Sequence, residues 1–500
     1  MSKKINGILL MIVGVVLMVF SLAADSMGIG DGSGINGAQI LVAVFGFILI
    51  IIGLWLFTLN KQLPLEKINP FIKKSTSQRI FIALLILGLG VAAIFFFNNL
   101  FPRIDIEEGK LNNKDFYLPY SGGIGGDFRL GIYRPPQMLL DGVNIYETRA
   151  TIYPPFVNLF FMPLQLFEEF DAYIFFVIIL FFTNILSVGL AAVLFKEVLL
   201  DRLGLAKDAS MLIALFLFFA MLIYTLTSYS FMLMVDRANY DSIAILLALL
   251  AVYLSIKKPE SLWLQVILLS IATHLKIYPA VLFIILFLKH GKKMILPAVL
   301  VNIVLLLSLG LNNAWLFFQN MFRFTESSFN FAISNHSGDF YARFLVRRLP
   351  KVKALFPVFS YLFKYLPVVI WGVSCYYIIR NLKFEKRALM ILMVSIPLMC
   401  MFPAVSHDYK LIIMSISFVI MTGLSIYKVI TTSRLWDYGL LAVILVLLFF
   451  IGRSFVLLPA SMALLMVKYP FLLTTAILML MIVYHLKEDD RSIAAAEPAG

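Results

Sequence analysis

The chain has 500 residues, of which 61% are hydrophobic, with a mean hydropathy of +0.95 and a formal net charge of +13. Soluble domains are about 45–50% apolar, and stretches of about 20 residues with few charges recur along the whole chain, each long enough for a helix to cross a bilayer. This composition excludes a soluble protein. It also argues against nucleic acid as a partner, because the cations lie in short loops beside apolar segments, where they orient the chain and contact anionic lipid.

The predicted elements are hydrophobic helices, because backbone polar groups in lipid must pair internally. We expect an all-α polytopic membrane protein with about 12–14 transmembrane helices. The first apolar segment could be a cleaved signal, but its length and the span that soon follows favour a retained helix. The candidate spans are 6–24, 37–58, 79–98, 172–195, 209–229, 240–256, 262–275, 277–289, 294–312, 358–380, 388–405, 409–430, 436–453 and 464–486.

The basic residues between these segments predict orientation. With a cytoplasmic N-terminus, the lysine- and arginine-rich loops after the second, fourth, sixth, eighth and tenth spans all lie in the cytoplasm. Both termini are then cytoplasmic, and the expected location is the cell (inner) membrane. The polar segments that fall on the opposite, outer side are 99–153, 230–239, 313–355, 406–408 and 454–463.

The outer loop 99–153 is the most informative part of the chain. Asp127 follows two glycines, which let the backbone approach a partner closely, although such an aspartate could equally cap the next helix. The segment RLGIYRPPQMLLDG at 129–142 predicts a short interfacial helix and then a turn at Asp141–Gly142. Tyr153-Pro154-Pro155 predicts the start of another helix.

Further polar clusters on the outer side precede or interrupt apolar segments. Asp236 opens a polar run before the sixth span, and Lys276 lies between two short helices that form a hairpin. A cation at membrane depth is costly and suggests a function, although it could also snorkel to the interface. His407 lies in the run Ser406–Lys410 and could contact a phosphate or have a structural role.

A basic cluster within 313–355 departs from the charge bias of the other outer segments. It is either an interfacial helix whose cations reach lipid phosphates or a site for an anion or a lipid headgroup. The cluster contains Arg343, Arg347 and Arg348.

The order of these motifs resembles the GT-C superfamily, and within it glycosyltransferase family 87, the polyprenol-phosphate-mannose-dependent mannosyltransferases. The resemblance covers residues 79–430. It implies a GT-C-like helix bundle with interfacial helices in the first large outer loop, and it leaves 1–78 as an added transmembrane hairpin. Residues 431–486 would form C-terminal transmembrane helices, and 487–500 a cytoplasmic tail.

The resemblance implies that a sugar, with mannose expected, moves with inversion from a polyprenyl phosphate to an acceptor at the outer face. Asp127 would be the general base, and His407 would lie near the donor phosphate. The acceptor could be a glycolipid, a glycan or a protein, and no obligatory metal is expected. Candidates for binding the donor phosphate or lipid are Arg129, Lys276, Lys410, Arg343 and Arg347. Candidates for binding substrate are Tyr133, Arg134, Tyr153 and Asp236.

Elementary chemistry agrees with this implication. A lipid phosphate is a good leaving group, so the pair of carboxylates used in glycoside hydrolysis is not required. One carboxylate can take the proton of the acceptor hydroxyl, while cations stabilise the departing phosphate. Two alternatives remain open: a transporter or flippase of lipid-linked saccharides, and a non-catalytic membrane subunit. Charges gathered at one interface favour the enzyme, since carriers place theirs near the bilayer midplane.

Overall fold

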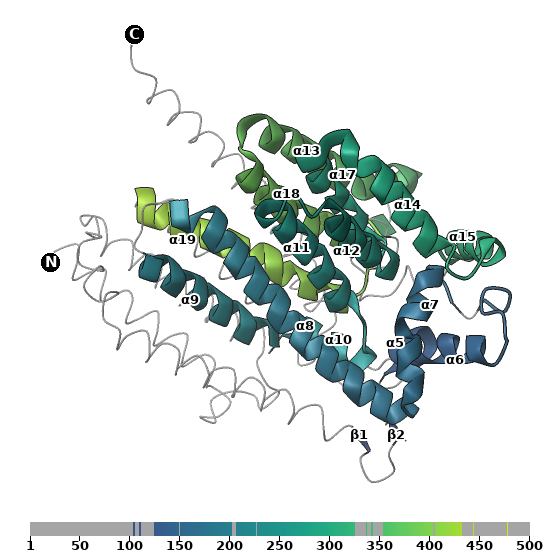
Figure 1. Ribbon diagram of the computed structural model, residues 1–500. Coiled ribbons are helices and arrows are strands. Elements are labelled where there is room, and N and C mark those ends of the chain that lie inside the picture. Colours follow the sequence, from purple (N-terminus) through teal and green to yellow (C-terminus); the bar gives the residue numbers. More distant parts are fainter. Residues whose placement is uncertain are drawn as a thin grey trace.

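The computed structural model is a bundle of α-helices (Figure 1). It describes residues 125–149, 151–202, 207–226, 228–325, 354–403 and 406–432, with a few short or single positions elsewhere. Two of those short pieces, β1 (Ile104–Asp105) and β2 (Lys110–Leu111), form an antiparallel pair. Apart from this pair, the regular structure of the described residues is helical, as the sequence predicts for an all-α polytopic membrane protein.

The first elements are short and lie in the layer that the sequence assigns to the outer loop. They are α5 (Gly126–Phe128), η2 (Arg129–Tyr133), α6 (Arg134–Leu140), α7 (Pro155–Phe161) and η3 (Met162–Leu166). The expected short helix is found, and the chain then turns at Gly142 with a φ of 76°. Pro155 opens α7, which confirms the predicted helix start.

The longer helices and their connecting turns follow in chain order. They are α8 (Glu169–Val198), η4 (Leu200–Arg202), α9 (Lys207–Leu226), α10 (Tyr229–Arg237), α11 (Asp241–Lys257), α12 (Leu262–Leu275), η5 (Tyr278–Leu282), α13 (Phe283–His290), η6 (Gly291–Met294), α14 (Ile295–Leu306), α15 (Leu311–Thr325), α17 (Phe356–Asn381), α18 (Phe384–Met401), η9 (Asp408–Ile413) and α19 (Met414–Thr432).

Most predicted spans within the described ranges are found as helices of varying length, but the predicted span 294–312 is broken, since α14 ends at Leu306 and α15 begins at Leu311. Three helical segments there are long and apolar enough to cross a membrane: α8, α17 and Tyr409–Ile426. A fourth candidate is the pair Tyr278–Leu306 and Leu311–Arg323, bent by 90° at a break. The predicted spans at 6–24, 37–58, 79–98, 436–453 and 464–486 fall outside the described residues, so the total of 12–14 stays a prediction.

Two predicted outer loops contain helices. Residues 230–239 largely form α10, which begins at an N-cap where the Ser228 hydroxyl accepts a hydrogen bond from the Phe231 N–H. The polar segment 313–355 begins inside α15, whose apolar residues follow one face. Both helices are short and amphipathic, so they do not stand out as membrane spans in the sequence.

Close packing and hydrogen bonds join the long helices. The helix α8 lies against α9, α11 and α19 (Figure 1). A Cβ at Gly423 of α19 would come within 2.7 Å of the Phe195 ring of α8, so only glycine fits there. Small residues of this kind let membrane helices approach. The hydroxyls of Thr183 and Ser242 lie 2.9 Å apart and link α8 to α11.

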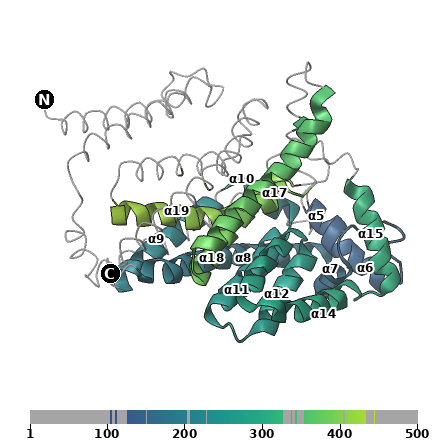
Figure 2. The same ribbon diagram turned by 90° about the horizontal axis from the view of Figure 1, so that it is seen from above.

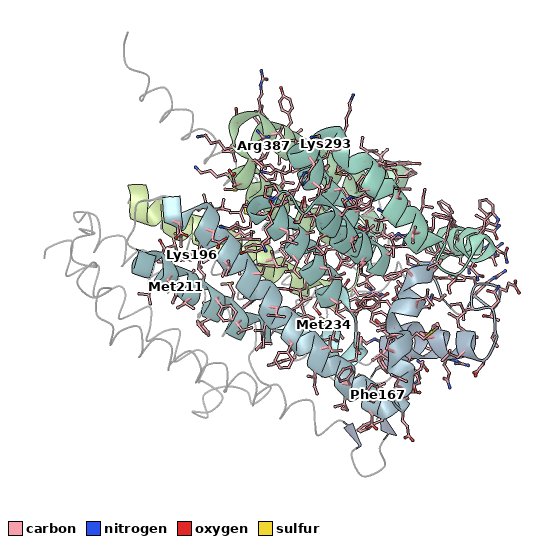
Figure 3. The ribbon with its side chains drawn as sticks, in the orientation of Figure 1. Phe167, Lys196, Met211, Met234, Lys293 and Arg387 are labelled. Carbon is pink, nitrogen blue, oxygen red and sulfur yellow. The ribbon has the colours of Figure 1, made fainter. Side chains whose placement is uncertain are left out.

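The two ends of the bundle differ in character. Lys196, Lys293 and Arg387 lie toward one end, and Phe167 lies at the other, beyond the first residue of α8 (Figure 3). The loops predicted to be cytoplasmic and the layer predicted to be outer therefore lie at opposite ends. Seen from above, α15 borders this outer layer beside α6 and α7 (Figure 2).

Candidate active site

The chain around Asp127 is tied directly to the turn after α10. Gly125 adopts a left-handed conformation with a φ of 69°, and its N–H donates to the Asp236 carbonyl at 2.6 Å. A Cβ at Gly126 would lie 3.1 Å from the guanidinium of Arg237. The glycine pair therefore lets α5 approach α10 closely enough for the next residue, Asp127, to meet Arg237.

Asp127 is held by two side chains from one turn. Its Oδ1 lies 3.3 Å from Nη2 of Arg237, and its Oδ2 accepts a hydrogen bond from Nδ2 of Asn239 at 3.3 Å. Ala238 between them has a φ of 51°, which ends α10 and directs both neighbours toward the carboxylate. The Asp127 side chain remains 26% exposed. It is thus fixed in position but open to a ligand.

Lys276 occupies the break between α12 and η5. Its Nζ lies 4.1 Å from the ring centroid of Tyr240 and 5.2 Å from that of Tyr153. Burial acts to lower the pKa of Lys276, but the carboxylates of Asp241 and Asp127 and the neighbouring Tyr153 together raise it above its ordinary value. Lys276 is therefore a fixed cation at neutral pH, held in an aromatic cage.

A second carboxylate lies behind this lysine. Asp241, the first residue of α11, is fully buried, and its Oδ1 is 3.9 Å from Nζ of Lys276. The same oxygen accepts a hydrogen bond from the hydroxyl of Tyr278 at 2.8 Å. On the other side of Tyr278, the Nζ of Lys410 lies 5.1 Å from the ring centroid. Asp241 and Tyr278 thus connect two buried lysines.

The segment η9 brings the predicted histidine cluster to this place. It packs against α10, which carries Arg237, and against α11, which begins at Asp241. His407, half-buried, has its ring centroid 5.6 Å from that of Tyr409. Residues far apart in the sequence therefore converge on one polar cluster, as their predicted common side requires.

Several candidates of the outer loop are engaged elsewhere. Arg129 forms an ion pair with Glu169 at the start of α8. The hydroxyl of Tyr133 donates to the Phe167 carbonyl at 2.9 Å, and Arg134 is exposed to solvent. These three side chains hold or cover the outer layer and do not join the Asp127 cluster.

The remaining candidates differ in where they lie. Tyr153 lies in the cluster, with its ring centroid 5.5 Å from that of Tyr240. Asp236 is 1% exposed and contributes its carbonyl to the turn. The guanidinium of Arg343 lies 5.3 Å from the centroid of the Phe356 ring, whereas Arg347 and Arg348 fall outside the described residues.

The sequence singled out Asp236 from a polar run whose later members are the ones that form the site. Arg237 and Asn239 contact Asp127, Tyr240 packs under Lys276, and Asp241 pairs with it. The signal available was the run itself, placed between two helices on the outer side. The left-handed turn at Ala238 determines which residues of this run face the site, and no residue pattern in the sequence predicts that turn.

An apolar groove of about 480 Å³ begins next to the cluster. Pro154 and Ile277 line it, and they directly follow Tyr153 and Lys276 in the sequence. The rest of the lining comes from α12, α14 and α15. It consists of Thr273, His274, Val299, Asn302, Ile303, Leu306, Phe317, Phe318 and Met321.

The arrangement combines an open carboxylate, fixed cations and a hydrocarbon-lined groove. The carboxylate can accept a proton, the cations can stabilise an anion, and the groove can hold an apolar chain. Within the described ranges, His, Cys, Asp and Glu side chains do not gather in threes that could bind a metal ion. Cys375 and Cys400 are free thiols buried inside helices.

Comparison with known proteins gives one family match. The model of glycosyltransferase family 87 matches residues 151–403, just over half of the chain. A search of curated proteins finds no match. The matched range includes Asp241 and Lys276, but it begins after Asp127 and ends before His407. The structure joins these flanking segments to the matched region.

Proposed function

Because the chain belongs to glycosyltransferase family 87, and is thus a membrane glycosyltransferase, we propose that it transfers a sugar from a polyprenyl-phosphate donor at the outer face of the cell membrane. Mannose is the expected sugar, and the acceptor is a glycolipid, a glycan or a protein. The reaction inverts the anomeric centre and needs no obligatory metal. The observation that carries the proposal is the partly exposed Asp127 carboxylate, which Arg237 and Asn239 hold in the same polar cluster as the caged Lys276.

Asp127 acts as the general base. The acceptor hydroxyl attacks the anomeric carbon, its proton passes to a carboxylate oxygen of Asp127, and the bond from that carbon to the phosphate oxygen breaks. The electron pair of this bond leaves with polyprenyl phosphate. Arg237 and Asn239 support this role because they fix the carboxylate from one side and leave it partly exposed.

Lys276 binds the donor phosphate, with Lys410 behind it. As the bond breaks, negative charge grows on the phosphate, and a cation already in place stabilises that charge without reorganisation. The ammonium of Lys276 lies between the two tyrosine rings and Asp241, so its position is defined before the donor arrives. His407, on the neighbouring segment, completes the phosphate side of the site.

The polyprenyl chain occupies the groove. Its lining is almost entirely hydrocarbon, and it starts at Ile277 and Pro154, each one residue from a side chain of the phosphate site. A chain anchored by its phosphate at Lys276 can therefore continue along α14, where it exchanges contacts with lipid tails for contacts with apolar side chains.

The outer location rests on charge and on placement. Tyr173, near the start of α8, donates a hydrogen bond to the Val235 carbonyl in α10, so the site lies at the end of α8 occupied by Phe167. Basic residues such as Lys196 and Lys293 lie at the other end (Figure 3). Basic residues favour the cytoplasmic side, so the site belongs on the outer side and the termini in the cytoplasm. Labelling of single cysteines placed at exposed Asp141 and Lys293 from either side of sealed vesicles tests this orientation.

The function itself is tested with purified protein in lipid nanodiscs. A panel of polyprenyl-phosphate sugars and of nucleotide sugars is supplied with a mixed glycolipid acceptor, and release of polyprenyl phosphate is measured with and without EDTA. We expect release from a polyprenyl-phosphate sugar, unaffected by EDTA, and a product of inverted configuration. Use of nucleotide sugars alone would refute the donor class. Movement of an intact lipid-linked sugar across the membrane without cleavage would favour a flippase.

A further inference from the structure

The carboxylate of Asp241 contacts Lys276 but takes no step in the transfer proposed above. It is fully buried, and its Oδ2 has no hydrogen-bond partner among the described residues. A buried carboxylate is costly unless nearby cations compensate for its lost hydration. Nearby cations should therefore compensate for this buried charge at the phosphate site.

Two lysines supply that compensation. The Nζ of Lys276 lies 3.9 Å from Oδ1 of Asp241. Lys410 is 6% exposed and lies over the ring of Tyr278, whose hydroxyl donates to the same oxygen. The positive charges of these two ammonium groups repel each other. Asp241 pairs with Lys276 directly and is linked to Lys410 through Tyr278.

We propose that Asp241 is a positioning residue that limits the positive charge of the phosphate site, so that polyprenyl phosphate can leave after transfer. This inference rests on the proposed function. The donor is a phosphodiester with one negative charge, whereas the product is a monoester with a charge of about −1.5 to −2. Two lysines without a counter-charge would therefore bind the product far more strongly than the donor. The fixed charge of Asp241 opposes the additional charge of the product.

The test is Asp241→Asn, which keeps the volume and the acceptor oxygen for Tyr278 but removes the charge. A unit charge a few ångströms away in a partly polar interior changes anion binding by about tenfold or more. We expect product inhibition by polyprenyl phosphate to tighten about tenfold and steady-state kcat to fall, while the rate of a single turnover does not fall. Tyr278→Phe removes the hydrogen bond and keeps the charge, so it should not tighten product inhibition.

Unchanged or weaker product inhibition in Asp241→Asn would overturn the inference. If that variant does not fold, Lys410→Met and the charge-balanced double variant Asp241→Asn with Lys410→Met provide the same test. The single change should weaken product inhibition, and the double variant should restore it. Equal inhibition in these two would also overturn the inference.

Failure of the proposed function can be distinguished from failure of this inference. It would appear as a wild-type protein that releases polyprenyl phosphate from none of the donors. Binding of polyprenyl phosphate alone, measured on the wild type and Asp241→Asn without any sugar donor, still tests the charge argument in that case. Tighter binding to the variant supports it, and equal or weaker binding refutes it.

Discussion

Replacing Asp127 with asparagine separates the chemistry of the site from its architecture. The change keeps the shape of the side chain and an acceptor oxygen for Asn239, which now lies 3.3 Å from Oδ2. It removes the base and the ion pair with Arg237. Loss of a general base slows transfer by about 10²–10⁴-fold, which corresponds to roughly 3–5 kcal/mol of activation free energy.

The effect on stability should be much smaller. The ion pair of Asp127 with Arg237 spans 3.3 Å, and the two side chains are 26% and 16% exposed. A partly exposed pair contributes only about 1 kcal/mol after screening by solvent. We therefore expect Asp127→Asn to melt within a few degrees of the wild type and to bind the donor normally, while release of polyprenyl phosphate nearly ceases.

The matched control is Asp141→Asn, an exposed acid in the turn of the same loop. It should transfer sugar at the wild-type rate. Both rates are measured in nanodiscs at saturating donor and acceptor, with donor binding measured separately. Transfer by Asp127→Asn within threefold of the wild type would refute the assignment of Asp127 as base.

Three further changes probe the groove, the histidine and the helix packing. Val299→Trp fills the groove and should raise the KM for long-chain donors more than for short-chain ones, whereas Val304→Trp, on the same helix and 68% exposed but outside the lining, should not. His407→Ala should lower kcat strongly, and an unchanged rate in reconstituted membranes would remove it from the site. Gly423→Ala should lower the free energy of unfolding by about 1–3 kcal/mol, because its Cβ would lie 2.7 Å from an aromatic ring. Gly372→Ala, with open space around it, should not lower it. Equal thermal melting of the two variants would contradict the packing argument.

The sequence alone determined the class of the fold and the side on which polar groups gather. Hydrophobic segments such as 262–275 match the observed helix α12 residue for residue, because a stretch of apolar residues in lipid has few options besides a helix. Sidedness followed from the lysines and arginines of the loops. From it came the expectation that Asp127, Lys276 and His407 lie on one side of the membrane.

The tertiary structure decided which polar residues meet. Arg129 lies two residues from Asp127, yet it turns to Glu169, while Arg237 arrives from a different helix to pair with Asp127. Asp241 becomes the counter-charge of Lys276 because α11 starts beneath the break after α12. Such contacts depend on helix lengths, on the left-handed turn after α10 and on the packing of distant segments. Local patterns fix where a charge enters the membrane, but only packing fixes which opposite charge compensates for it.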